Sequence, residues 1–113
     1  MVSLLVIPWS VWWVDFDPQL GREQAGRRPA IVAGTQFACD MPNGLAVVVP
    51  CTSTDRQLPF HVAVNLHGRD GFAMCDQLKS ISRQRFAGPH RTGILDKDEI
   101  RDIQFALRRI IDI

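Results

Sequence analysis

The stretch that says most about the fold is Leu45-Ala46-Val47-Val48-Val49-Pro50, an apolar run without a charged residue. A continuous run of this kind, rich in β-branched side chains, is typical of a strand that is buried on both of its faces. It follows a predicted loop over residues 36–44 and ends in Cys51-Thr52-Ser53-Thr54. We therefore expect residues 45–50 to form a core strand of a sheet.

Other segments on both sides of this run also have the composition of strands. They are rich in β-branched and aromatic residues or alternate with a period of two, and they cover residues 11–16, 29–35, 60–65, 71–75 and 77–81. Residues 83–91 are basic and irregular, and Gly88 and Pro89 predict a loop or a broken helical turn there.

One helix is predicted, at the end of the chain. Asp96 can cap it, and Glu99 follows at the spacing of a capping box. Apolar residues then recur every three or four positions, at Ile100, Ile103, Leu107, Ile110 and Ile111, and this stripe should pack on the sheet. Many strands followed by one terminal helix imply a single α+β domain over residues 1–113, with a mostly antiparallel, barrel-like sheet.

Composition limits the possible functions. The chain has 113 residues, 46% of them hydrophobic and 22% charged, with a formal net charge of +1. A core of this size gains from oligomerisation, so we expect a dimer. The small net charge argues against nucleic-acid binding through an overall positive field, and any phosphate recognition must be local.

The start of the chain and the cysteines lead us to expect a cytoplasmic protein that does not span a membrane. Residues 1–7 are apolar but too short to span a membrane, and they should form a terminal strand or arm. Cys39, Cys51 and Cys75 have no Cys-x-x-Cys spacing, which favours neither a disulfide framework nor a zinc site. The scattered histidines likewise predict no metal site.

Arg28 is the first candidate for chemistry, because it stands where a glycine-bracketed polar loop, residues 21–28, meets the strand that begins near Pro29. A guanidinium is permanently charged and suits the geometry of phosphate. The plainer interpretation is a solvated loop arginine beside a sheet edge. Residues alone leave the two interpretations about even.

Thr52 ends the buried run, so it can face the same groove as Arg28 if the two strands are neighbours. A cation and a hydroxyl can together hold a phosphodiester and stabilise its pentavalent transition state. Glu23, in the same loop as Arg28, could accept a proton. Each has a structural alternative: Thr52 can close a turn through its hydroxyl, and Glu23 can be a solvated acid.

Adjacent Trp12 and Trp13 must point to opposite faces of their strand. At most one of them enters the core from this strand, and the other should meet a dimer partner, the terminal helix or solvent. A core or interface role is favoured over contact with a nucleobase.

Several motifs, spread in order over nearly the whole chain, resemble the MazF/PemK family of toxin endoribonucleases, the mRNA interferases of type II toxin–antitoxin systems. They are Val11-Trp12-Trp13-Val14-Asp15-Phe16-Asp17-Pro18, Gly21-x-Glu23-Gln24-Ala25-Gly26-x-Arg28-Pro29-Ala30, Val49-Pro50-Cys51-Thr52-Ser53, Pro59-Phe60, and Arg69-Asp70-Gly71 through Asp76-Gln77-Leu78-Lys79-Ser80-Ile81. The resemblance implies a CcdB/PemK-like, SH3-like barrel acting as a homodimer. One departure is Pro8-Trp9-Ser10, where family members commonly carry a basic residue, a glycine and an acid before the first strand.

The resemblance also implies an activity and a set of residues. Such enzymes cut single-stranded RNA, usually mRNA, at short preferred sequences without a metal or other cofactor, by attack of the RNA's own 2′-hydroxyl, which leaves a cyclic phosphate and a 5′-hydroxyl. Arg28 and Thr52 match the family's catalytic pair, and Glu23 matches an acid with a supporting role. The expected substrate-binding residues are Arg22, Gln24, Arg27, Ser53 and Arg56.

Partners and alternatives follow from the same resemblance. A cognate antitoxin is expected to lay an acidic C-terminal segment over the basic groove. The alternative is a CcdB-like toxin that binds gyrase, but that branch depends on a tryptophan near its C-terminus, whereas this chain ends Ile110-Ile111-Asp112-Ile113. A catalytically silent relative is a third possibility, against which the presence of Arg28 and Thr52 argues.

Overall fold

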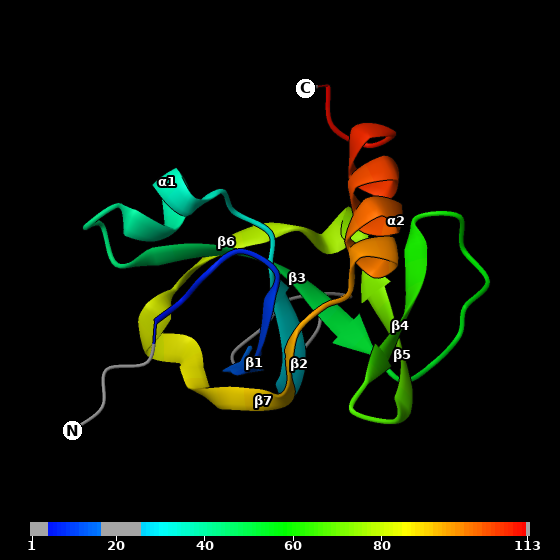
Figure 1. The fold of residues 1–113 in the computed structure, drawn as a ribbon, viewed down its shortest axis with the longest axis horizontal. Coiled ribbons are helices and arrows are strands. Elements are labelled where there is room, and N and C mark those ends of the chain that lie inside the picture. Colours follow the sequence, from blue (N-terminus) through cyan, green and yellow to red (C-terminus); the bar gives the residue numbers. More distant parts are fainter. Residues whose placement is uncertain (1–4, 17–25, 113) are drawn as a thin grey trace.

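A computed structural model describes residues 5–16 and 26–112 of the chain. Seven strands and two α-helices, with two short 3-10 turns, make up the described part (Figure 1). In chain order the elements are β1 (Ser10–Asp15), β2 (Arg27–Val32), α1 (Gln36–Asp40), β3 (Leu45–Thr52), β4 (His61–Leu66), β5 (Arg69–Met74), η1 (Cys75–Gln77), β6 (Lys79–Ser82), η2 (Arg83–Arg85), β7 (Phe86–Ile94) and α2 (Lys97–Arg108).

The strands form one curled sheet in which every pairing is antiparallel. Its order is β4-β5-β3-β2-β1-β7, and β6 pairs with the first half of β3 while β5 pairs with its end. The strand β3 therefore lies at the centre, as the apolar run predicts. The expectation of an α+β fold with a mostly antiparallel, barrel-like sheet and a C-terminal helix is confirmed.

Side chains from the two faces of the sheet build two separate cores. One core, under α2, contains Val11, Ile31 and Val49, and the other contains Trp12, Val14 and Val48. The alternation along β1 is the reason why adjacent tryptophans separate: Trp12 is 7% exposed, whereas Trp13 is 38% exposed. The prediction that only one of them enters the core is confirmed.

The helix α2 begins as predicted. Asp96 accepts a hydrogen bond from the backbone N–H of Glu99, whose own carboxylate accepts one from the N–H of Asp96, so the capping box is complete. The second carboxylate oxygen of Glu99 accepts a hydrogen bond of 2.5 Å from the N–H of Asn65 in β4. The cap therefore also fastens the helix to the sheet, and Figure 1 shows α2 standing over the β3–β5 part.

The apolar stripe of α2 packs on the sheet through Ile103 and Leu107, which are buried, and through the partly buried Ile100 and Ile111. Ile110 departs from the prediction, because it is 44% exposed. The helix ends at Arg108, and the turn that follows takes Ile110 off the buried face.

Two segments differ from the sequence-based expectation. Residues 36–44 contain the helix α1, whose N-cap Thr35 accepts a hydrogen bond from the N–H of Ala38. Residues 83–91, expected to be irregular, contain η2 and most of β7. In the described part β7 pairs only with β1, and the register shifts along that pairing. An edge strand of this kind tolerates Pro89 and needs no regular apolar alternation.

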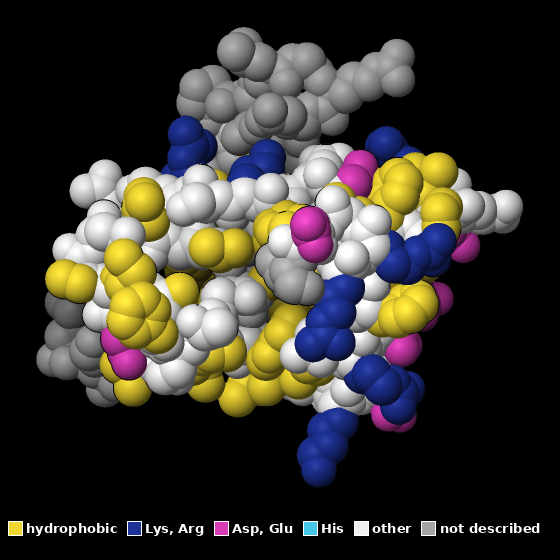
Figure 2. Space-filling model, turned by 90° about the horizontal axis from the view of Figure 1, so that it is seen from above, with side chains coloured by type: hydrophobic (Ala, Val, Ile, Leu, Met, Phe, Trp, Pro, Cys, Tyr) yellow, Lys and Arg dark blue, Asp and Glu magenta, His cyan; other side chains and the backbone are white. Residues whose placement is uncertain are grey.

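The surface near α1 and the surface near α2 differ in the type of side chain that they expose. Seen from above, apolar side chains gather over the α1 end, and most of the charged side chains lie over the α2 end (Figure 2). Phe37, Met41 and Leu45 are the large exposed apolar side chains at the α1 end. Residues 5–7 form no strand, so the described part of the N-terminus is an arm. No helix among the described residues is long and apolar enough to cross a membrane.

Candidate active site

A groove of about 210 Å³ opens where the ends of several strands meet. It draws side chains or backbone from β1, β2, β3, β4, β5 and β7, although these strands are far apart in the sequence. The lining residues are Trp13, Arg27, Arg28, Pro29, Cys51, Thr52, Ser53, Leu66, Arg69, Asp70, Gly71 and His90.

Arg28 and Thr52 meet in this groove because β2 and β3 are neighbours in the sheet. The two strands pair antiparallel through Ala30↔Pro50 and Ile31↔Val49. When that register is continued toward the groove, Arg28 comes to lie opposite Thr52. Residues directly opposite in an antiparallel pair lie on the same face of the sheet. The condition set by the sequence, that the two strands be neighbours, is met.

Thr52 is a nearly buried residue at the base of the groove, 7% exposed. Its hydroxyl oxygen accepts a hydrogen bond from the backbone N–H of Thr54 at 3.2 Å. This is the turn-closing bond of the structural interpretation, and it is compatible with chemistry, because a hydroxyl that accepts one bond keeps its own proton to donate.

The groove is positively charged although the whole chain is nearly neutral. Arg27, Arg28 and Arg69 contribute three positive charges and Asp70 one negative charge, a local sum of +2, against +1 for all 113 residues. Arg28 is half-buried, whereas Arg27, Arg69 and Asp70 are exposed. The positive charge is therefore local, as the small net charge requires for phosphate binding.

Two aromatic rings also line the groove. Trp13 of β1 and His90 of β7 lie with their ring centroids 4.9 Å apart and their planes tilted by 40°. Sequence reasoning assigned neither residue to the site. The exposure of Trp13 follows from strand alternation, but nothing in the pattern of residues 83–91 predicts that His90 reaches this groove.

The structure places some of the predicted site residues in the groove and one outside it. Arg27, Arg28, Thr52 and Ser53 all line the groove. Arg56 is exposed in the connection between β3 and β4 and is not among the lining residues. Glu23, Arg22 and Gln24 lie outside the described residues. Arg69 and Asp70, which belong to the motifs quoted above but were not predicted as site residues, also line the groove.

Cys51 adjoins Thr52, but its thiol is not an activated nucleophile. Burial, and next the proximity of the Cys75 thiol, raise its pKa well above the ordinary value of 9.0. Burial likewise raises the pKa of Cys75 to about 12. Both thiols are therefore protonated at neutral pH, so neither is an activated nucleophile, and the hydroxyl of Thr52 remains the candidate on β3. Within residues 5–16 and 26–112, no three His, Cys, Asp or Glu side chains gather as a metal site.

Comparison with known proteins identifies the family. Residues 8–111 match the family described as PemK-like, MazF-like toxin of type II toxin–antitoxin system. The chain belongs to this family. The match includes Pro8-Trp9-Ser10, so the unusual entry into β1 does not place the chain outside it.

Curated relatives agree with this assignment over most of the chain. The endoribonuclease toxin MazF of Escherichia coli K12 is 39% identical over 99 residues, which are 88% of this chain and 87% of the relative. Endoribonuclease MazF9 of Mycobacterium tuberculosis is 30% identical, covering 92% of this chain and 94% of its own. Both carry the name endoribonuclease, so the alternative of a gyrase-binding protein is not favoured.

Solved structures have the same fold. MazF from Deinococcus radiodurans superimposes with a TM-score of 0.84 at 26% identity, covering 98% of this chain and 100% of the other. The MazE–MazF complex from the same organism gives a TM-score of 0.77 at 27% identity, covering 98% and 99% of the two chains.

Proposed function

We propose that this endoribonuclease of the MazF/PemK family cuts single-stranded RNA in the groove between β2 and β3, without a metal ion, at short preferred sequences. The observation that carries the proposal is the convergence of Arg28 and Thr52 on one positively charged groove. The groove combines positively charged and aromatic side chains, which suits an unpaired strand whose phosphates and bases are both accessible.

Two groups in the groove suit the charge that develops at phosphorus. The guanidinium of Arg28 can form paired N–H···O bonds to the non-bridging oxygens, and the hydroxyl of Thr52 can donate one more. Both interactions strengthen as the phosphorane gains negative charge, so they lower the barrier instead of only tightening binding. Arg27 and Arg69 hold the neighbouring phosphates.

The proposed reaction is an internal transesterification. The 2′-oxygen forms a bond to the adjacent phosphorus, and the bond from phosphorus to the 5′-oxygen breaks, giving a 2′,3′-cyclic phosphate and a 5′-hydroxyl end. The proton of the 2′-hydroxyl passes to a base, for which Glu23 is our candidate, and the departing 5′-oxygen takes a proton from water. The side chain of arginine is already protonated at neutral pH, so it cannot take this proton in place of Glu23.

One substrate series tests this chemistry. A single-stranded RNA with one cut site is compared with the same strand carrying a 2′-deoxy sugar on the 5′ side of the scissile bond, in excess chelator. We expect cleavage of the first, cyclic phosphate ends by mass spectrometry, and no cleavage of the second. Cleavage of the deoxy strand, or loss of activity in chelator, would overturn the mechanism.

We also propose that the protein forms a homodimer in the cytoplasm and that a cognate antitoxin inhibits it by laying an acidic segment over the groove. The Deinococcus radiodurans relative is found in complex with MazE, and the local charge of +2 complements an acidic peptide. A peptide of this kind should compete with RNA, and its affinity should fall when Arg27 and Arg69 are replaced by glutamine. Inhibition that leaves RNA binding unchanged would contradict this.

A further inference from the structure

The aromatic part of the groove lining has features that phosphate chemistry does not require. Trp13 is 38% exposed although its neighbour Trp12 is 7% exposed, so a large aromatic face remains in contact with solvent. This face lines the same groove as Arg28 and Thr52. In the register of β1 and β2, Trp13 lies opposite Pro29, one residue from Arg28. The backbone of Trp13 is therefore about one strand spacing, roughly 5 Å, from the strand that carries Arg28.

His90 is held in a defined orientation against Trp13. Its Nδ1 accepts a hydrogen bond from the backbone N–H of Thr92 at 3.1 Å and lies 2.9 Å from the hydroxyl oxygen of Thr92. Because a backbone N–H can only donate, Nδ1 must be the acceptor, and the neutral ring carries its proton on Nε2. The His90 ring, which packs at a tilt against Trp13, therefore has a defined tautomer with its Nε2–H available to donate to a ligand.

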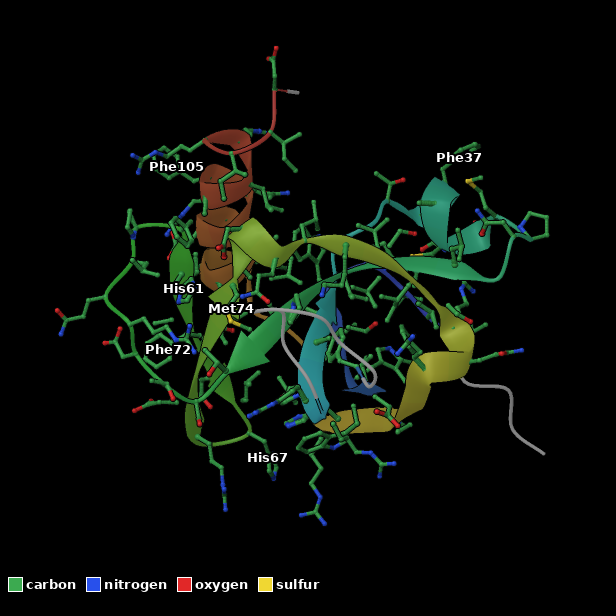
Figure 3. All side chains as sticks on the ribbon, turned by 180° about the vertical axis from the view of Figure 1, so that it is seen from behind. Phe37, His61, His67, Phe72, Met74 and Phe105 are labelled. Carbon is green, nitrogen blue, oxygen red and sulfur yellow. The ribbon has the colours of Figure 1, made fainter. Side chains whose placement is uncertain are left out.

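The surroundings keep this ring neutral. Burial and then the nearby His67 lower the pKa of His90 below its ordinary value of 6.5. His67 lies in the turn that joins β4 and β5, and Figure 3 shows it at the tip of that hairpin, at the same end of the molecule as β7. A neutral ring packed against Trp13 suits an uncharged flat ligand better than a phosphate.

We propose that Trp13 and His90 form a nucleobase-binding shelf, on which one base next to the scissile phosphate stacks and accepts a hydrogen bond from Nε2 of His90. This inference rests on the proposed function, since it places the base of the same RNA whose phosphate is held by Arg28. Stacking on an aromatic side chain changes single-strand affinity roughly ten- to hundredfold per base. The added N–H donor selects among bases by their acceptors, so the shelf contributes to the sequence preference at one position.

The first test measures binding without cleavage. A short 2′-O-methyl RNA containing the cut sequence is titrated into the protein while tryptophan fluorescence is recorded. We expect quenching in the wild type and in Arg28→Ala at higher RNA concentration, and none in Trp13→Phe, whose remaining Trp9 and Trp12 are set apart from the groove. Equal quenching of tryptophan fluorescence by bound RNA in the wild type and in Trp13→Phe would overturn the shelf, whether or not the protein cleaves RNA.

The second test measures cleavage specificity on a series of RNA strands, each lacking one base. At one position beside the cut, base removal should raise the half-saturating concentration about tenfold for the wild type and leave it unchanged for Trp13→Ala and His90→Ala, with maximal rates within about threefold. His90→Gln, which keeps a donor, should restore part of the preference. If all three variants cut at the same sites as the wild type with the same half-saturating concentrations, or differ from it only in oligomeric state, the proposal is overturned. The role of Arg28 is left intact by either result.

Discussion

The hydroxyl of Thr52 accepts a hydrogen bond from the backbone N–H of Thr54, so a side chain that lines the groove also closes the turn after β3. The two roles can be separated by measuring stability and cleavage on the same variants. A purely structural threonine would affect only the first quantity.

Thr52→Val keeps the shape of the side chain and removes the hydroxyl. We expect single-turnover RNA cleavage to fall about 100- to 1,000-fold, because one donor to the transition state is lost. The free energy of unfolding should fall by only about 1 kcal/mol, the usual effect of one lost hydrogen bond. Thr54→Val is the matched control, since Thr54 contributes its backbone N–H and not its side chain to the bond. Equal effects of the two variants on cleavage would count against the role of Thr52.

Glu99 connects α2 to the sheet as well as capping it. Glu99→Ala removes the acceptors of the N–H groups of Asp96 and Asn65, so we expect the free energy of unfolding in urea to fall by about 1 to 3 kcal/mol. Asp98→Ala, at an exposed position in the same first turn, is the control and should cost less than about 0.5 kcal/mol. Cleavage well below the unfolding midpoint should stay within about twofold of wild type for both variants, because neither side chain reaches the groove.

The lowered pKa of His90 makes stability depend on pH with a definite sign. Between the folded-state pKa and the ordinary value of 6.5, the unfolded chain binds a proton that the folded chain does not. Stability contributed by the neutral ring is therefore present above 6.5 and is lost as the pH falls through that window. Below it, a protonated Nδ1 could no longer accept from the N–H of Thr92.

His90→Gln isolates this effect. Urea unfolding at about pH 7.5 and about pH 5.5 should show a smaller loss of stability on acidification for the variant than for the wild type. His67→Gln, which removes the imidazole that helps to lower the pKa of His90, should also reduce the loss. An identical pH dependence in wild type and His90→Gln would show that His90 does not titrate in this range.

The parts of the fold and site that sequence reasoning identified are those fixed by hydrophobic patterning. The apolar run at residues 45–50 and the strand before it had to be buried, and two buried strands became neighbours, which is what brings Arg28 to Thr52. The capping box at Asp96 and Glu99 is likewise a local sequence pattern, and the structure contains it as predicted.

The parts that were missed depend on contacts between distant segments. His90 lies in β7, an edge strand whose register shifts beside β1, so its sequence carries no period from which its orientation could be predicted. The helix α1 is too short for an apolar stripe and begins at a single threonine cap. The aromatic pair of Trp13 and His90 could therefore not be predicted from the sequence, because it depends on the pairing of β1 with β7.

The most direct test of the central claim is the single-turnover rate at which Arg28→Ala cleaves a defined single-stranded RNA, with Arg101→Ala as control. Arg101 is an exposed arginine of α2 and lies outside the groove, so the Arg101→Ala variant should cleave RNA at the wild-type rate. We expect Arg28→Ala to fold normally and to lose at least about 1,000-fold in rate, because the cation at the transition state is gone. A folded Arg28→Ala protein that cleaves within about tenfold of wild type would contradict the account.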